Sequence, residues 1–178
     1  DLILICGADQ IHPPDMLKKL VGHWNKGCEV VSALVPCRGY VSWQPMKPFQ
    51  KMGWRFKPTG IQGRQYRNMQ LDWDMVEIID PAKGDLQRVD LIGSGVLMFH
   101  RDHLLALKRP WFKETIHEES FQRIANQDAV FAWRLRTEAH AQIWVDTTIE
   151  VKHLHAFQID GTYPERFADW AEDNVGDP

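Results

Sequence analysis

The order of apolar and polar stretches at the start of the chain predicts a strand–helix–strand unit. Residues 2–6 (LILIC) are an unbroken apolar run, which is typical of a strand that is buried on both faces. Residues 29–35 (EVVSALV) are rich in residues that favour strands and end at Pro36, so they predict a second strand. Between them, apolar side chains recur at the spacing of one helix face: Leu17, Leu20, Val21 and Trp24. We therefore predict two parallel strands joined by a helix over residues 13–26, which begins with two prolines and ends at Gly27.

The rest of the chain continues to alternate between strand-like and helix-like stretches. Residues 113–126 are polar and predict a loop with a short helical turn, and residues 161–178 form an acidic tail. The alternation predicts one α/β domain over residues 1–178. Further strands are predicted over residues 75–79, 87–99, 143–145 and 149–155, and further helices over residues 101–108 and 127–139, the latter with Asn126 as its N-cap.

Residues 37–76 interrupt this alternation. They are rich in glycine, proline, tryptophan and basic residues, with little periodicity, and long stretches without clear elements are usually functional or mobile. The segment is locally basic although the formal net charge of the whole chain is -3. We interpret it as an irregular, solvated excursion, or alternatively as a surface for a phosphate-bearing or acidic ligand.

Composition argues against several classes of protein. A net charge of -3 gives no reason to expect nucleic acid or an anionic membrane as partner, and no apolar run approaches the roughly 20 residues that span a bilayer. The 3 cysteines are an odd number without metal-like spacing, and Cys6 and Cys28 are predicted to be small core residues. We therefore expect a reducing, cytoplasmic location, with the oligomeric state left open.

Acidic and imidazole side chains at the predicted element ends are the candidates for chemistry. Asp9 follows the first strand, at the sheet edge where open α/β folds bind ligands, and Asp128 falls in the first turn of a helix. Asp9 with His153 or His155, which alternate onto one strand face, would suit Mn²⁺ or a similar divalent ion. Turn formation, helix capping and core packing are the alternative roles for these residues. A zinc pair of the two histidines is disfavoured, because the Asp-His that follows in the familiar hydrolase pattern is absent.

Four segments in a fixed order carry a resemblance to a known family. LILICGADQIHPPDMLKKL looks like a strand, a D-x-D motif and a proline-bearing helix start, and LIGSGVLMFHRDHLLALKRPWF is similar to a glycine-interrupted strand, a helix and a "PWF" segment. NQDAVFAWRLRTEAHAQIWVD resembles the helix whose second acid is the catalytic base, and IEVKHLH resembles the late strand that bears a metal-binding histidine. Over about residues 1–155 the chain thus resembles the catalytic half of a GT-A glycosyltransferase of the inverting family 2 type.

The resemblance implies both a fold and a reaction. The fold would be the GT-A type of α/β fold, with a mixed, mostly parallel sheet flanked by helices. The reaction would be metal-dependent transfer, with inversion, of a sugar from a nucleotide-diphosphate donor to a hydroxyl of a glycan or another acceptor. The implied roles are catalytic base for Asp128, donor binding for Ala8 and Asp9, Mn²⁺ or Mg²⁺ binding for Asp9 and His153, and acceptor binding for Gly93, Ser94, Gly95 and Trp111.

The chain also departs from the family pattern. Gly7 stands where the D-x-D motif has its first aspartate, and Gln127 replaces the acid that often precedes the base. The nucleotide-binding β/α half that comes before D-x-D in the family is missing, so we expect an N-terminally truncated sequence. The alternative function is therefore a non-catalytic remnant of the fold that binds a glycan or a protein through its aromatic residues.

Overall fold

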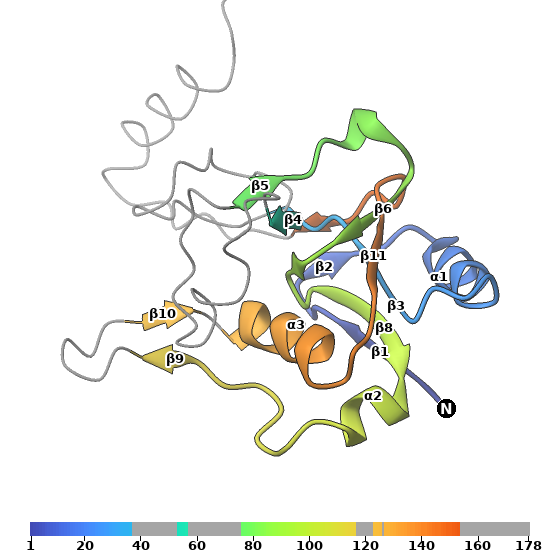
Figure 1. The fold of residues 1–178 in the computed structure, drawn as a ribbon. Helices are drawn as coiled ribbons and strands as arrows, with labels where there is room; N and C mark the ends of the chain where they lie inside the picture. The colour runs from blue at the N-terminus through green and yellow to red at the C-terminus, as the bar shows by residue number, and fades with distance from the viewer. Residues whose placement is uncertain (37–52, 57–75, 117–122, 126, 154–178) are drawn as a thin grey trace, which may run out of the picture.

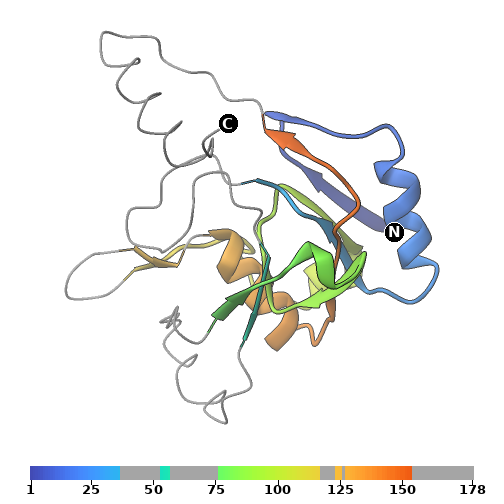
Figure 2. The same cartoon turned by 90° about the horizontal axis from the view of Figure 1, so that it is seen from above.

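A five-stranded sheet forms the centre of the computed structural model, which describes residues 1–36, 53–56, 76–116, 123–125 and 127–153 (Figure 1). Helices α1 (Met16–Trp24) and α3 (Gln127–Thr137) cover its two faces (Figure 2). This arrangement confirms the predicted α/β class. The strands lie in the order β1 (Leu2–Cys6), β8 (Val96–His100), β3 (Val30–Ala33), β11 (Ile143–Asp146) and β6 (Leu86–Val89).

The sheet is mixed, but it is not mostly parallel as the family resemblance implied. Of its neighbouring strands, β3 and β11 run parallel, whereas the β1–β8, β8–β3 and β11–β6 pairs are antiparallel. Strands β1 and β3, which α1 joins, point in the same direction, but β8 lies between them. Met98 of β8 pairs with Leu4 on one side and Val31 on the other. Strand β8 thus takes an inner position in the sheet, where all but its last residue are buried.

Strand β1 is not covered on both faces, contrary to the prediction from its composition. Leu2, Leu4 and Cys6 are exposed, while Ile3 and Ile5 are half-buried. Strand β1 lies at the edge of the described sheet; Ile3 and Ile5 pack against the core that includes Phe99, whereas the alternate side chains point to the opposite face and are exposed. The prediction that Cys6 is a core residue is therefore wrong, whereas the prediction for Cys28 is confirmed because that residue is buried.

Helices α1 and α3 pack on separate hydrophobic cores on the two faces of the sheet. Residues of β8 alternate between the two cores, because successive side chains of a strand point to opposite faces. The α1 core contains Met16 and Leu20 together with Val96 and Met98. The α3 core contains Phe131 and Leu135 together with Leu97 and Phe99, and the Phe99 and Phe131 rings lie 5.7 Å apart.

The helices are shorter than predicted. Helix α1 begins at Met16 with Asp15 as its N-cap, so the two prolines lie outside it, and Gly27 follows its end with a φ of 93°. Helix α2 (Arg101–Leu105) covers only the first part of the predicted 101–108 helix, whereas α3 agrees with the prediction over Gln127–Thr137. None of the helices in the described ranges is long and apolar enough to cross a bilayer.

The apolar stretch of residues 87–99 forms parts of three strands rather than one interrupted strand. Strand β6 is followed by β7 (Leu91–Ile92), and Gly93, Ser94 and Gly95 form the turn from β7 into β8. A three-stranded sheet of β5 (Val76–Ile78), β4 (Gly53–Phe56) and β7 stands beside the main one, and a short 3-10 helix (Pro81–Lys83) precedes β6. Strand β4 corrects the prediction that residues 37–76 are irregular; most of that segment lies outside the described residues.

Two small two-stranded sheets complete the described fold. Strands β9 (Thr115–Ile116) and β10 (Arg123–Ala125) pair where a loop with a helical turn was predicted, and they lie away from the main sheet (Figure 1). Strands β2 (Gln10–Ile11) and β12 (Lys152–His153) pair antiparallel. His155, Asn126 and the predicted acidic tail lie outside the described residues.

Candidate functional site

The turn that carries Asp9 lies directly against the turn between β7 and β8. The backbone N–H of Gly7 donates a hydrogen bond of 2.8 Å to the carbonyl oxygen of Gly95. The two turns meet because β1 and β8 are antiparallel, with the last residue of β1 opposite the first residue of β8. In this arrangement Ala8 is exposed and Asp9 is half-buried. The predicted donor and acceptor segments thus lie side by side at one edge of the sheet.

Asp128 is joined to the same place through its side chain. The Ser94 hydroxyl donates a hydrogen bond of 2.6 Å to Oδ1 of Asp128. Asp128 is half-buried in the first turn of α3, where the N-terminal end of the helix interacts favourably with a carboxylate. Because a carboxylate has two oxygens, Asp128 is able to accept a proton at Oδ2 while Ser94 holds Oδ1.

His153 is brought to this edge by strand pairing. In the β2–β12 pair, His153 lies opposite Gln10, the residue that follows Asp9. The side chain of His153 and the whole of His155 lie outside the described residues. The backbone register therefore places the predicted metal-binding segment next to Asp9, and the choice between the two histidines stays a prediction.

Trp111 lies on the loop that follows α2 and is anchored to α3. The buried guanidinium of Arg134 donates hydrogen bonds to the carbonyl oxygens of Lys108, Pro110 and Trp111 at 2.6, 2.7 and 3.2 Å. The guanidinium of Arg109 lies 4.7 Å from the centre of the Trp111 ring, within the range of a cation–π contact. Trp111 is therefore held by the same helix that carries Asp128, and its role in acceptor binding stays a prediction.

Gln10 is a site residue that sequence reasoning missed. Its side chain lies between Gly7 and Gly95, in the space that a Cβ atom on either glycine would occupy. The carboxamide oxygen of Gln10 is buried. The sequence offers one signal for this arrangement, which is a glycine at position 7 where the family motif has an aspartate.

The described residues supply only part of a metal-binding set. Among the side chains that the structure describes, no group of three or more histidine, cysteine, aspartate or glutamate residues is placed to hold a metal ion. Asp9 provides one carboxylate, and Gly7 provides none. Since Mg²⁺ and Mn²⁺ favour oxygen-rich octahedral sites, a cation here would need further ligands, such as the oxygens of a diphosphate.

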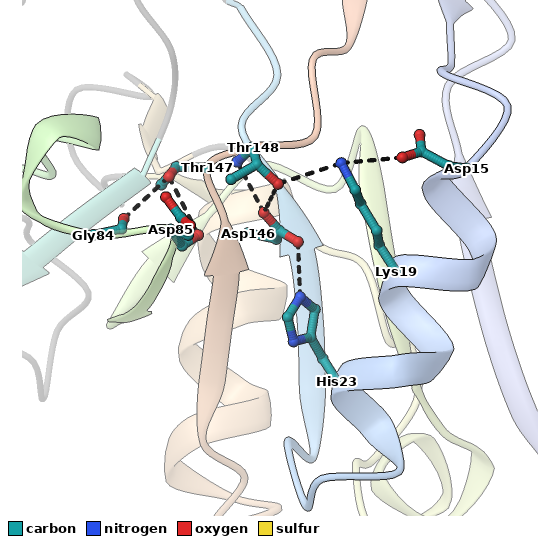
Figure 3. A network of polar contacts seen from close by, with 8 residues as sticks. All are labelled: Asp15, Lys19, His23, Gly84, Asp85, Asp146, Thr147 and Thr148. Atoms are coloured by element: carbon teal, nitrogen blue, oxygen red, sulfur yellow. Dashed lines mark hydrogen bonds and ion pairs between the residues drawn. The ribbon is translucent and has the colours of Figure 1, made fainter.

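A second polar cluster, also missed by sequence reasoning, lies at the end of β11 (Figure 3). His23 Nε2 is 2.7 Å from Oδ2 of Asp146, and Oδ1 of Asp146 accepts hydrogen bonds from the backbone N–H and the hydroxyl of Thr148. Burial alone would raise the pKa of Asp146, but the hydrogen bonds from Thr148 and His23 outweigh it and hold this pKa below its usual value. Lys19 links the cluster to Asp15, at 3.1 Å, and to the Thr148 hydroxyl at 3.4 Å. These contacts join α1 to β11, so we interpret the cluster as structural.

Comparison with known proteins adds information on the fold alone. No family model matches the chain, and no curated protein matches it. Among solved structures, A197 from STIV is similar, with a TM-score of 0.50 and 15% sequence identity. The match covers 88% of this chain and 59% of that chain, so the present chain spans about three fifths of that protein. The structure and this likeness together establish a mixed α/β fold with a five-stranded sheet flanked by helices.

Proposed function

We propose that this chain is the catalytic part of an inverting glycosyltransferase, which moves a sugar from a nucleotide-diphosphate donor to an acceptor hydroxyl. The observation that supports this proposal most strongly is the hydrogen bond between Ser94 and Asp128, next to the Gly7–Gly95 contact. These contacts join segments from three distant parts of the sequence at one edge of the sheet. The β2–β12 register adds His153, the fourth segment of the family pattern.

In this proposal Asp128 is the general base. Its carboxylate removes the proton from the acceptor hydroxyl as that oxygen attacks the anomeric carbon from the face opposite the leaving diphosphate. Ser94 fixes the orientation of the base through Oδ1, and the absence of a side chain at Gly95 allows close approach to the adjoining turn. A divalent cation held by Asp9 and His153 would neutralise the charge on the leaving diphosphate.

The alternative is a non-catalytic domain that retains the fold and binds a glycan or a protein. The observation that favours it is the pair Gly7 and Gln10, which leaves Asp9 as the only carboxylate on this turn. A donor-binding turn with one acid, in place of the two of the family motif, has less charge with which to hold a cation. The two functions therefore differ most clearly in whether a nucleotide sugar binds in a metal-dependent manner.

Calorimetric titration of the chain with UDP-sugars and GDP-sugars, with and without Mn²⁺, tests the proposal. We expect metal-dependent binding that Asp9→Asn abolishes, and sugar transfer that Asp128→Asn lowers by about 10²–10⁴-fold without loss of donor binding. Asp102→Asn is the matched control, because Asp102 is exposed and follows the end of β8 that lies away from Asp9. Binding that is absent, or that does not depend on metal, would instead favour the non-catalytic alternative.

A further inference from the structure

We infer that Gln10 is a positioning residue, which holds the Asp9 turn in register with the turn that carries Ser94. This inference rests on the proposed function, because it assigns Gln10 a task at that same site. It starts from the two glycines that face each other across the hydrogen bond between Gly7 N–H and the Gly95 carbonyl oxygen. The Gln10 side chain fills the slot between them, which we call the glycine slot.

While the Gln10 carboxamide is seated in the glycine slot, a side chain at either glycine would collide with it. A Cβ atom on Gly7 would lie 2.7 Å from both Cδ and Nε2 of Gln10 and 3.1 Å from its Cγ. A Cβ atom on Gly95 would overlap Nε2 of Gln10 and would lie 3.1 Å from a methyl carbon of Val35. Such distances are below ordinary van der Waals contact, so the seated carboxamide requires glycine at both positions.

Gln10 also connects the glycine slot to the third segment of the site. Its backbone belongs to β2 and pairs with His153 of β12, while its side chain contacts the turns on either side of the Gly7–Gly95 hydrogen bond. One residue thus touches the segments that carry Asp9, Ser94 and His153. Because Ser94 in turn holds Asp128, movement of the Gln10 carboxamide is expected to change the separation between the donor turn and the base.

The same geometry means that an acid at position 7 would displace the Gln10 side chain from the glycine slot. The Cβ atom of an aspartate at position 7 would lie 2.7 Å from Cδ and Nε2 of the seated Gln10 carboxamide. The side chain of Gln10 therefore occupies the space next to Asp9 in which the family motif has its first aspartate. In this structure the long, neutral side chain of Gln10 thus fills the space beside Gly7.

Four variants test the inference: Gly7→Ala, Gln10→Ala, the double variant Gly7→Ala/Gln10→Ala, and Gln10→Glu. The binding probe is UDP with Mn²⁺ in calorimetry, and thermal melting reports the stability of each variant. We expect Gly7→Ala and Gln10→Ala each to weaken UDP binding by about tenfold, and the double variant to be no weaker than Gln10→Ala, because the added methyl group then has room. Gln10→Glu keeps the shape of the side chain and should retain tighter binding than Gln10→Ala. Gly22→Ala is the matched control, because nothing lies within 4 Å of a Cβ at Gly22.

The outcomes separate the inference from the proposed function. Wild-type protein that does not bind UDP in the presence of Mn²⁺ would overturn the proposed function, and with it the task assigned to Gln10. Wild-type binding combined with additive effects of Gly7→Ala and Gln10→Ala would overturn the inference and leave the proposed function standing. If the Gln10→Ala variant binds UDP as tightly as wild type, the inference is also overturned and the proposed function still stands.

Discussion

Arg134 provides the sharpest test of how the loop before Trp111 is held. Only 4% of its side chain is exposed, and its guanidinium donates to three backbone carbonyls of residues 108–111 and to both carboxylate oxygens of Glu138. Arg134→Met keeps most of the apolar volume but removes all of these donors. We expect this variant to unfold more easily than wild type, and to lose the fixed position of Trp111.

The expected loss of stability in Arg134→Met can be estimated from the groups that the guanidinium contacts. A hydrogen bond to a charged group contributes about 1.5–3 kcal/mol, but the three carbonyls lie on a partly exposed loop where water can replace some of the donors. The ion pair with Glu138, made through two hydrogen bonds, adds roughly 0.5 kcal/mol, because 42% of the Glu138 side chain is exposed and solvent screens the pair. We therefore expect Arg134→Met to lower the free energy of unfolding by about 3–5 kcal/mol, or the melting temperature by about 10 °C.

Urea denaturation followed by tryptophan fluorescence measures this loss. Glu138→Gln is the control on the same helix, and we expect it to cost less than about 1 kcal/mol because it leaves the three carbonyl bonds in place. A loss below about 1 kcal/mol for Arg134→Met would refute the reasoning, since the buried guanidinium would then contribute no more than a surface charge.

Three further predictions concern the base, the buried acid and the α1 core. Ser94→Ala is expected to lower kcat for sugar transfer by about tenfold with little change in the donor KM, and Ser94→Thr to restore it; equal losses in both variants would contradict an orienting hydroxyl. Because the pKa of Asp146 is lowered in the folded state, its stabilisation is present at neutral pH and is lost as the pH falls through that lowered pKa. Asp146→Asn should thus cost about 1–3 kcal/mol at pH 7 in denaturant titrations and less at about pH 3, and a cost independent of pH would speak against this role. Leu20→Ala should cost about 2–5 kcal/mol because Leu20 is fully buried, against less than about 0.5 kcal/mol for Leu17→Ala at a position that is 54% exposed, as measured by denaturation midpoints.

Much of the local structure could be predicted from apolar patterns. The stripe that includes Leu20 predicted α1, and the apolar run before Pro36 predicted β3, all of whose residues are buried. Helix α3 was predicted from its apolar side and its acidic first turn. These features depend on residues close in sequence, so their periodicity is visible without knowledge of the fold.

The arrangement of the strands could not be predicted in the same way. An apolar run such as residues 2–6 is equally compatible with an inner strand and with an edge strand that exposes Leu2 and Leu4. The choice depends on β8, whose sequence lies far from β1 and whose register carries no local signal. The glycines on either side of Ser94 predicted an interruption in a strand, and the structure has a turn between strands of two sheets there. An interruption within one strand and a turn between two strands have the same composition, so the sequence does not distinguish them.

The candidate site likewise contains residues that could be predicted from the sequence and residues that could not. Asp9, Asp128 and His153 were selected from their positions after strands or at a helix start, and their backbone segments meet at one edge of the sheet. Gln10 was missed because its environment is created by two glycines that are far apart in sequence. Asp146 was missed because its partner His23 lies on a different element and follows no periodic pattern.

The position of β8 between β1 and β3 has a consequence for the order in which the protein folds. Strands β1 and β3 do not pair with each other in the sheet, because β8 lies between them. During synthesis, β8 becomes available only after residue 100 has left the ribosome. Contacts of such high sequence separation slow folding and leave apolar strand edges exposed in the meantime. Nascent chains halted before β8 should therefore be readily cleaved by protease within β1 and β3, and chains halted well beyond it should resist; early protection of both strands would show that they first pair with each other.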